Sequence, residues 1–347
     1  MSPYFINTPV SGSWYGKWGS LMKSGLLCAL AAGVCVLAAA PGPGYAADPY
    51  PSKPIRLLVG FPPGGPTDII GRVIGKGLSE QLGQPVVVEN RGGAGGVIAA
   101  RAVATAQPDG YTLLVSVESS QTRGVALNKS LPYDAVKDFS FAGKIAKQRN
   151  LVVVNPQLSV SNIKELIAYA RAHPSELNFG GTYGATSHIG GALFSMDNGV
   201  KMTFVSYPGG AQPITDLMSG ILQVGFFTEA TIATHVKAGK LKPLAIAAPE
   251  RSQAFPDVPT LQEAGAEPME LSPWFGLVGP AGMDAHVVAR LEQAINRLVQ
   301  DKAFQVELAN IGAVPIAGSG SRAFHDDVVK EIAYWKKFVV DADIPVN

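Results

Sequence analysis

The sequence predicts an α/β protein made of two lobes in series. The chain has 347 residues and 47% of them are apolar, which suffices for two cores and exceeds one ordinary domain. Short apolar runs alternate with segments of helical periodicity, and this alternation is completed twice before the chain ends in consecutive helices. Such a pattern is typical of sheets that are covered by helices on both faces.

The first 46 residues predict a secretory signal peptide. The apolar run Leu26–Ala40 follows Lys17 and Lys23, and small residues follow it, so cleavage is expected after Ala46. An uncleaved membrane anchor is the alternative, but the run is shorter than the about 20 residues that cross a bilayer. Met22 begins a signal of ordinary length and is a candidate for the true start, with Met1 as the alternative.

Composition excludes several classes of function. Cys28 and Cys35 both lie in the signal segment, so the secreted chain has no disulfide, thiol nucleophile or cysteine-bound metal. The 28 Lys and Arg residues nearly balance the 27 Asp and Glu residues, which leaves no basic field for nucleic acid.

The first α/β unit begins with the apolar strand Ile55–Gly60. The helix Thr67–Leu82 follows, with apolar residues at helical spacing and Gly83 at its end. The remaining elements expected in this unit are a strand at Val86–Glu89, a helix at Val97–Ala106 and a strand at Tyr111–Val115.

A second unit of the same kind starts at the strand Leu151–Val154. Its further elements are helices at Ile163–Ala172, from about Thr186 and at Pro213–Ser219, and strands near Asn178 and at Thr203–Val205, Leu222–Phe226 and Leu244–Ala247.

The tail predicts a return to the first lobe. After a strand at Gly276–Gly279, helices are expected at Asp284–Gln300, Ala303–Ile311 and Ser321–Val340. The last two need a sheet to cover apolar faces such as Phe324, Val328, Ile332 and Trp335. Lobe 1 is therefore expected to comprise residues 47–149 and 274–347, and lobe 2 residues 150–273, with two crossing strands between them.

Three glycine-rich loops, at residues 61–68, 180–187 and 207–213, share one layout. Each follows a strand, contains an aromatic residue, and leads into a helix. Unpaired N–H groups at such helix starts bind anions, and glycine lets a ligand approach the backbone. The alternative is that each loop only turns the chain.

Two enzyme motifs are matched only in part. Pro66 stands where a phosphate-binding loop needs lysine, and Ile98 stands at the third glycine position of a dinucleotide fingerprint. The five histidines are scattered, and no GxSxG elbow occurs. We therefore expect no catalytic residues, no metal and no cofactor.

With these loops in view, the sequence resembles the Bug-type solute receptors of tripartite tricarboxylate transporters over nearly the whole secreted chain. The matching segments include KPIRLLVGFPPGGPTD (53–68), LGQPVVVENRGGAGG (82–96), PDGYTLL (108–114), LPYDAVKDF (131–139), AGKLKPLAI (238–246), FPDVPTLQEAG (255–265) and PWFGLVGPAG (273–282).

The resemblance implies a two-lobed periplasmic binding protein of the Venus-flytrap type, type II-like, with two crossing strands. It also implies a periplasmic monomer that takes a small organic acid and has a membrane permease as its partner. A receptor that passes ligand to a signalling system, or a periplasmic enzyme, remains an alternative.

The resemblance also places the ligand site on the three glycine loops and on the loop after the third strand. The expected ligand-binding residues are Phe61, Gly64, Gly65, Thr67, Asp68, Ser116, Glu118, Ser119, Tyr183, Thr186, Ser187, Tyr207, Gly209, Phe227 and Thr228.

This chain departs from the family pattern at four of its loop positions. Pro66, Pro208, Glu118 and Phe227 replace residues that are common there, so an amino acid or citrate is not the expected ligand. Our hypothesis is that four aromatic residues, Phe61, Tyr183, Tyr207 and Phe227, face an apolar or ring portion of the ligand. Glu118 would accept a hydrogen bond from it, or else would point to solvent from the rim.

Overall fold

The computed structural model of the protein describes residues 50–207 and 210–346. The predicted signal peptide, the candidate start at Met22 and the predicted ligand residue Gly209 lie outside the described residues. Within that part of the chain, every helix is too short or too polar to span a membrane.

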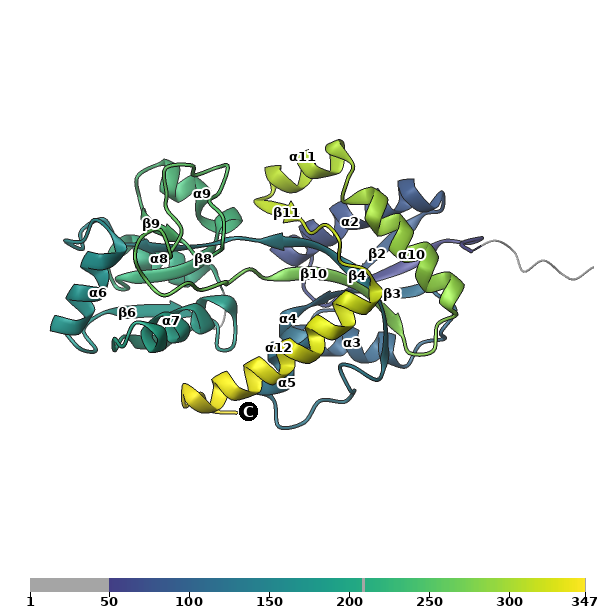
Figure 1. Ribbon diagram of the computed structural model, residues 1–347, viewed down its shortest axis with the longest axis horizontal. Helices are drawn as coiled ribbons and strands as arrows, with labels where there is room; N and C mark the ends of the chain where they lie inside the picture. The colour runs from purple at the N-terminus through teal and green to yellow at the C-terminus, as the bar shows by residue number, and fades with distance from the viewer. Residues whose placement is uncertain (1–49, 208–209, 347) are drawn as a thin grey trace, which may run out of the picture. The chain divides into compact units, whose positions relative to one another are not determined.

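The first sheet has six strands in the order β11-β4-β10-β3-β1-β2 (Figure 1). Their bounds are β1 Ile55–Val59, β2 Val86–Asn90, β3 Thr112–Val117, β4 Phe139–Gln148, β10 Trp274–Pro280 and β11 Ala313–Pro315. β1 pairs in parallel with β2 and β3, whereas β10 runs antiparallel to both β3 and β4. The sheet is mixed because β10 returns from the second sheet while β4 leads out to it.

Both faces of this sheet are covered by helices, because the consecutive residues Leu57, Leu58 and Val59 of β1 are all buried. Leu57 and Val59 pack toward α2, α10 and α11, whereas Leu58 packs toward α3 and the first half of α12. The bounds of the helices are α2 Pro66–Leu82, α3 Val97–Ala104, α10 Ala285–Leu298, α11 Lys302–Asn310 and α12 Ser321–Asp341. A short 3-10 turn, Ala94–Gly96, precedes α3, and two short helices, α4 (Glu118–Gln121) and α5 (Arg123–Leu127), follow β3.

The second sheet has five strands in the order β7-β6-β8-β5-β9. Their bounds are β5 Asn150–Val154, β6 Asn178–Gly181, β7 Thr203–Ser206, β8 Val224–Thr228 and β9 Lys242–Ile246. α6 (Ile163–Ala172) and α7 (Thr186–Asp197) contribute to the core on one face, and α8 (Ala211–Ser219) and α9 (Glu229–Lys237) to the core on the other.

Two crossing segments join the sheets and are hydrogen-bonded to each other. The N–H of Gln148 donates to the carbonyl of Pro273 at 2.9 Å, and the side chain of Asn150 donates to the carbonyl of Leu271. The expected fold, two α/β lobes joined by two crossing strands, is therefore confirmed. The exact lobe boundaries remain a prediction, and we use lobe 1 for residues 50–149 and 274–346 and lobe 2 for residues 150–273.

α12 does not stay within lobe 1, which corrects the expectation for Trp335. Phe324 and Val328 pack in the core of the first sheet, but Trp335 and Phe338 pack in a cluster dominated by residues of the second sheet. A helix of 21 residues is about 30 Å long, so its second half extends beyond the sheet that its first half covers.

Candidate ligand-binding site

The loop after β1 is held by Asp68 and is not free to present all its amides. Gly64 has a φ of +80°, which favours glycine, and its N–H donates to Asp68 Oδ2 at 2.8 Å. The other Asp68 oxygen accepts from Asn90 and Arg72 at 2.8 and 3.0 Å. Burial works to raise the pKa of Asp68, but these hydrogen bonds and the charge of Arg72 outweigh it and hold the pKa below its usual value.

This arrangement shows what Asp68 and Gly64 do within the loop, while their expected contact with a ligand stays a prediction. Asp68 is only 2% exposed and both its carboxylate oxygens accept hydrogen bonds within the protein, so it positions the loop. The Gly64 amide is likewise already paired. Gly65 forms the N-cap of α2, and Phe61 and Thr67 remain half-buried.

Two further segments of lobe 1 meet this loop. A Cβ on Gly60 would lie 2.6 Å from the Cα of Gly96, so the backbones touch at a distance that only glycine allows. Asn90 donates to the carbonyl of Phe61 at 3.0 Å, and Ser119 Oγ donates to the carbonyl of Gly95 at 2.9 Å. The loops that follow β1, β2 and β3 thus form one contiguous edge, to which Asn90 and Gly96 contribute although sequence reasoning did not name them.

The loops after β6 and β7 meet in the same way in lobe 2. The N–H of Tyr207 donates to the carbonyl of Gly181 at 2.9 Å, and the side chain of Ser187 lies against Gly181. His188 accepts from the Gly184 N–H at 3.1 Å through Nδ1. Burial, with the charge of Arg123, lowers the pKa of His188 to about 4, so the ring is neutral and accepts this bond at neutral pH.

Helices α2 and α7 begin at these loops without a side-chain cap. The N–H groups of Thr67 and Asp68, and those of Thr186 and Ser187, have no acceptor among the described residues. By contrast, the starts of α6, α10 and α11 are capped by the side chains of Asn162, Asp284 and Asp301. Helices α3, α8, α9 and α12 also lack a side-chain cap. Unpaired N–H groups at a helix start attract anions, so α2 and α7 offer one such group of donors in each lobe.

Contacts through α5 connect the two groups of loops. A Cβ on Gly184 would lie 3.0 Å from a methyl group of Leu127, the last residue of α5. The hydroxyl of Tyr183 donates to the carbonyl of Pro345 in the C-terminal segment. The loop after β6 in lobe 2 is therefore in contact with the segment that directly follows α4 in lobe 1.

Glu118 is buried and paired, so it does not point to solvent from a rim; its expected hydrogen bond to a ligand stays a prediction. Its Oε2 accepts from Arg123 Nη1 at 2.9 Å, and the two side chains are 11% and 4% exposed. Burial raises the pKa of Glu118 to about 7, although Arg123 acts to lower it. Ser116 is also turned inward, because its hydroxyl donates to Gln121 at 3.0 Å and the residue is fully buried.

The four predicted aromatic residues are placed differently from one another. Phe227 is 7% exposed and packs with Leu151 and Leu217 in the core of lobe 2, so it offers no face to a ligand. Tyr207 packs against the same core and donates its hydroxyl to Asp216 at 2.7 Å. Phe61 and Tyr183 are half-buried at the loops themselves. Thr228, the N-cap of α9, is within 3.3 Å of the hydroxyl of Thr231.

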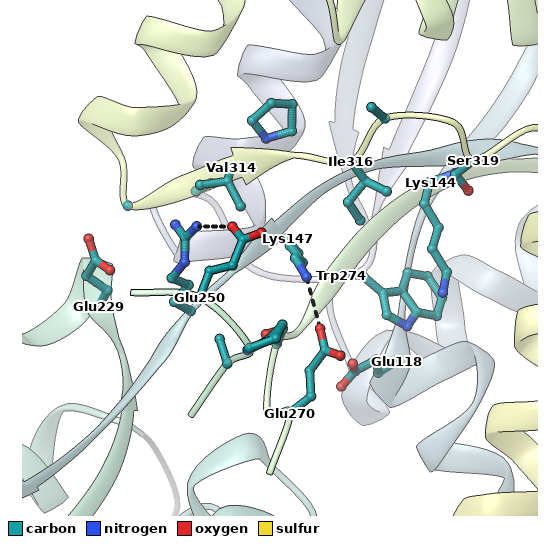
Figure 2. Close-up of a pocket in the computed structure, with 18 of the residues that line it drawn as sticks. Glu118, Lys144, Lys147, Glu229, Glu250, Glu270, Trp274, Val314, Ile316 and Ser319 are labelled. Atoms are coloured by element: carbon teal, nitrogen blue, oxygen red, sulfur yellow. Dashed lines mark hydrogen bonds and ion pairs between the residues drawn. The ribbon is translucent and has the colours of Figure 1, made fainter. Parts of the chain in front are cut away.

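A cavity of about 1110 Å³ lies between residues of the two lobes, next to the crossing segments (Figure 2). Of the predicted ligand residues only Glu118 lines it; the glycine loops do not. Within the described ranges, no three His, Cys, Asp or Glu side chains are grouped so that they could hold a metal ion.

Comparisons with known proteins agree with this architecture. The profile of the tripartite tricarboxylate transporter family receptor matches residues 70–341. Protein BugT of Bordetella pertussis is 35% identical over 307 residues, which cover 87% of this chain and 93% of BugT.

Two solved structures from Rhodopseudomonas palustris are also similar. One, solved with adipate, is 33% identical with a TM-score of 0.75 and covers 85% of this chain and 99% of its own. The other, MatC with bound malate, is 30% identical with a TM-score of 0.71 and covers 84% of this chain and all (100%) of its own. The chain therefore belongs to the tripartite tricarboxylate transporter family receptors, the Bug-type periplasmic solute-binding proteins.

Proposed function

We propose that this protein captures a small organic anion between its lobes, at the starts of α2 and α7, and delivers it to the permease of a tripartite tricarboxylate-type transporter. The observation that carries the proposal is the pair of uncapped helix starts, one in each lobe, within loops that are connected through α4 and α5. Capture requires no chemical step, so we expect binding without turnover.

Backbone and hydroxyl donors suffice to hold a carboxylate. The N–H groups of Thr67, Asp68, Thr186 and Ser187 supply four donors. Each hydrogen bond to a charged group contributes about 1.5–3 kcal/mol, or roughly 6–12 kcal/mol in total before the costs of association. Because those costs consume several kcal/mol, we expect micromolar affinity, near −8 kcal/mol.

The ligand that fits best is a dicarboxylate with an apolar stem. Two relatives of known structure were solved with adipate and with malate, which are both dicarboxylates. The two helix starts offer donors for one carboxylate each, while Phe61 and Tyr183 are the half-buried aromatic residues beside them. A stem such as that of adipate would pack against these rings, which favours it over the shorter and more polar malate.

Delivery of the ligand to the permease depends on how the two lobes are arranged around it. A ligand that bridges donors of both lobes stabilises the arrangement in which both sets reach it, and so shifts the population toward that arrangement. We infer that the permease recognises this ligand-bound arrangement.

A proline at the first position of α7 tests the backbone donors directly. Thr186→Pro removes one N–H, and proline is well tolerated at this position because its φ suits the first helical turn. The preceding residue, Ala185, has φ −75° and ψ 168°, the extended conformation that a following proline requires. Thr186→Val is the matched control, since it removes the hydroxyl but keeps the N–H.

Isothermal titration with adipate and malate provides the measurement. We expect Thr186→Pro to weaken binding by about 10- to 150-fold, the value of one hydrogen bond to a charged group. The valine variant should lose less. Equal affinity in wild type and in a folded Thr186→Pro variant, or consumption of the ligand during titration, would contradict the proposal.

A further inference from the structure

The turn between β6 and α7, residues 182–185, which we call the β6–α7 loop, sets the direction of the lobe 2 donors. Gly184 has a φ of +72°, and Ala185 after it is extended, with φ −75° and ψ 168°. The N–H of Ala185 donates to the carbonyl of Thr182 at 2.9 Å, which closes the turn. Because α7 begins directly after it, the shape of this loop decides where the first N–H groups of α7 point.

One side chain of α7, that of His188, reaches back and holds this loop. His188 is the third residue of the helix, and its Nδ1 atom accepts from the Gly184 N–H at 3.1 Å. The residue is only 6% exposed, and the centre of its ring lies 4.0 Å from that of Phe204 in β7 and 4.9 Å from that of Tyr183. This packing keeps the acceptor atom at the Gly184 amide.

The imidazole of His188 is a neutral acceptor. Burial, with the charge of Arg123, lowers the pKa of His188 to about 4, so at neutral pH one of the two ring nitrogens carries no hydrogen. Since Nδ1 accepts the bond, the hydrogen of the ring is on Nε2. A carboxylate at this position would place a negative charge beside the first N–H groups of α7 and would repel an anion, whereas the neutral ring does not.

Lobe 1 contains the same arrangement with a different acceptor. Gly64 has a φ of +80°, and its N–H donates to Asp68, the third residue of α2, at 2.8 Å. In both lobes a glycine with positive φ thus stands two residues before the helix and donates to the side chain four residues later. The acceptor in lobe 1 is charged, but Arg72 lies 3.0 Å from it and compensates the charge. Both helix starts of the proposed anion site are therefore held in one way.

This contact orders a helix start without using its first amides. At α6 the corresponding bond, from the Ser161 N–H to Glu165, is accompanied by the side-chain cap of Asn162, which accepts from the Glu165 N–H. At α7 the side-chain cap is missing, because Ala185 has no acceptor, and the bond to His188 remains. The turn before α7 is thus fixed while the first N–H groups of the helix stay available to a ligand.

We propose that His188 is a positioning residue of the lobe 2 anion site: by accepting the Gly184 N–H, it keeps the β6–α7 loop in the shape that directs the first N–H groups of α7 toward a carboxylate. This role rests on the proposed function, since it concerns the same donors. His188 acts here through the loop and not by contact with the ligand. Loss of the acceptor atom should therefore weaken ligand binding even in a variant that folds.

Two amide substitutions separate the acceptor atom from the ring. In His188→Asn the side-chain oxygen lies as far along the side chain as Nδ1 and can accept from Gly184, whereas in His188→Gln it lies one bond farther out, at the place of Nε2. Both variants are uncharged and both lack the ring, so they share the loss of packing. His286→Gln, at an exposed position of α10, is the control for a histidine outside the site.

Isothermal titration with adipate gives the ligand readout, and thermal unfolding confirms that each variant is folded. We expect His188→Gln to bind about five- to tenfold more weakly than wild type, the value of one neutral hydrogen bond, and His188→Asn to bind at least about threefold more tightly than His188→Gln. His286→Gln should stay within about twofold of wild type. The proposal is overturned if folded His188→Gln binds as tightly as wild type, or if the Asn and Gln variants bind equally.

The hydrogen position on the ring is a second readout that needs no variant and no ligand. Nitrogen NMR of the isotope-labelled wild type at neutral pH should show the hydrogen of His188 on Nε2; a hydrogen on Nδ1 would overturn the proposal. Thr186→Pro keeps the two proposals apart. Normal adipate binding by Thr186→Pro contradicts the anion site itself, whereas weakened binding by it, together with equal affinities of the two His188 variants, contradicts only the role of His188.

Discussion

Arg123 donates a 2.9 Å hydrogen bond to Glu118, and both side chains are buried, with Arg123 beside Trp335 of α12. The guanidinium of Arg123 lies 5.6 Å from the centre of the Trp335 ring, and its Nε atom is buried without a partner in the described chain. A buried ion pair contributes less than its geometry suggests, because both charges lose their hydration. Because burial also shifts the pKa of Glu118, the free energy of unfolding is expected to depend on pH through this pair.

We predict that Glu118→Gln changes how stability depends on pH. Burial raises the pKa of Glu118 from 4.5 to about 7, so the folded protein holds this proton more tightly than the unfolded chain. The contribution of the protonated Glu118 to the free energy of unfolding is complete below about pH 4.5 and is lost as the pH rises through about 7. Between about pH 5 and pH 8, wild type should lose on the order of 1–3 kcal/mol relative to Glu118→Gln in urea unfolding. Parallel stability curves for the two proteins would contradict this.

Giving α7 a side-chain cap should separate stability from binding. Ala185 has the extended conformation of an N-cap but no side chain that could accept a hydrogen bond. Ala185→Asp should raise the free energy of unfolding by about 0.5–2 kcal/mol. It should also weaken adipate binding at least about tenfold, because the new carboxylate occupies the amides that the ligand needs and repels it.

The natural cap of α6 provides the matched comparison for this experiment. Asn162 accepts from the N–H of Glu165 at 2.9 Å, far from the candidate site in the sequence. Asn162→Ala should cost about 1 kcal/mol of stability and leave adipate affinity unchanged. If Ala185→Asp bound adipate as tightly as wild type, α7 would not be the anion site.

A methyl group at Gly312 should disturb the contact between β11 and α9. Gly312 has a φ of +66°, and a Cβ there would lie 2.9 Å from the backbone of Ala230. Gly318 has a φ of +73° with open space around it, so Gly318→Ala reports the backbone strain alone. We expect Gly312→Ala to lower the free energy of unfolding by about 1–3 kcal/mol more than Gly318→Ala, as in other overpacked sites. Equal losses of unfolding free energy in denaturant titrations would show that the two segments move apart to accommodate the methyl group without loss of stability.

Asp68→Asn should loosen the loop after β1. The substitution replaces one accepting oxygen by an NH₂ group that faces the donors of Gly64, Arg72 or Asn90. Because a buried donor without a partner is costly, we expect a loss of about 1–3 kcal/mol in unfolding experiments, together with weaker adipate binding. The contribution of Asp68 is present above its ordinary pKa and is lost as the pH falls further, because its folded pKa is lowered.

The exposed face of α12 supplies the control for this variant. Asp326 has a side chain that is 55% exposed, so Asp326→Asn should change stability by less than about 0.5 kcal/mol. Unchanged stability and unchanged adipate affinity in Asp68→Asn would indicate that the loop keeps its shape without the carboxylate.

Most regular elements could be predicted because their signals are local. The strand at β1 and the helix at α2 agree with their predicted ranges to within one residue, since apolar spacing and a terminal glycine mark them. β4 was not predicted because its sequence, FSFAGKIAKQ, contains two lysines and a glycine, which are not typical of a buried strand. Lys144 is tolerated there only because Asp327 and Glu331 of α12 neutralise it, 183 and 187 residues away in the sequence.

Three features could be predicted from the amino-acid sequence alone: the two α/β units, the return of the tail to the first lobe, and the position of the glycine loops before α2 and α7. These features follow from periodicity, turn residues and helix starts, which each lie within a few residues of chain. Three others became known only from the folded chain: Asp68 holds its own loop, Phe227 belongs to the core, and Glu118 is paired with Arg123. The charged partners of Asp68 and Glu118 lie within five residues of them, but whether these side chains and Phe227 are exposed or buried is set by segments that are distant in the sequence. Burial is therefore the property that the local sequence does not encode.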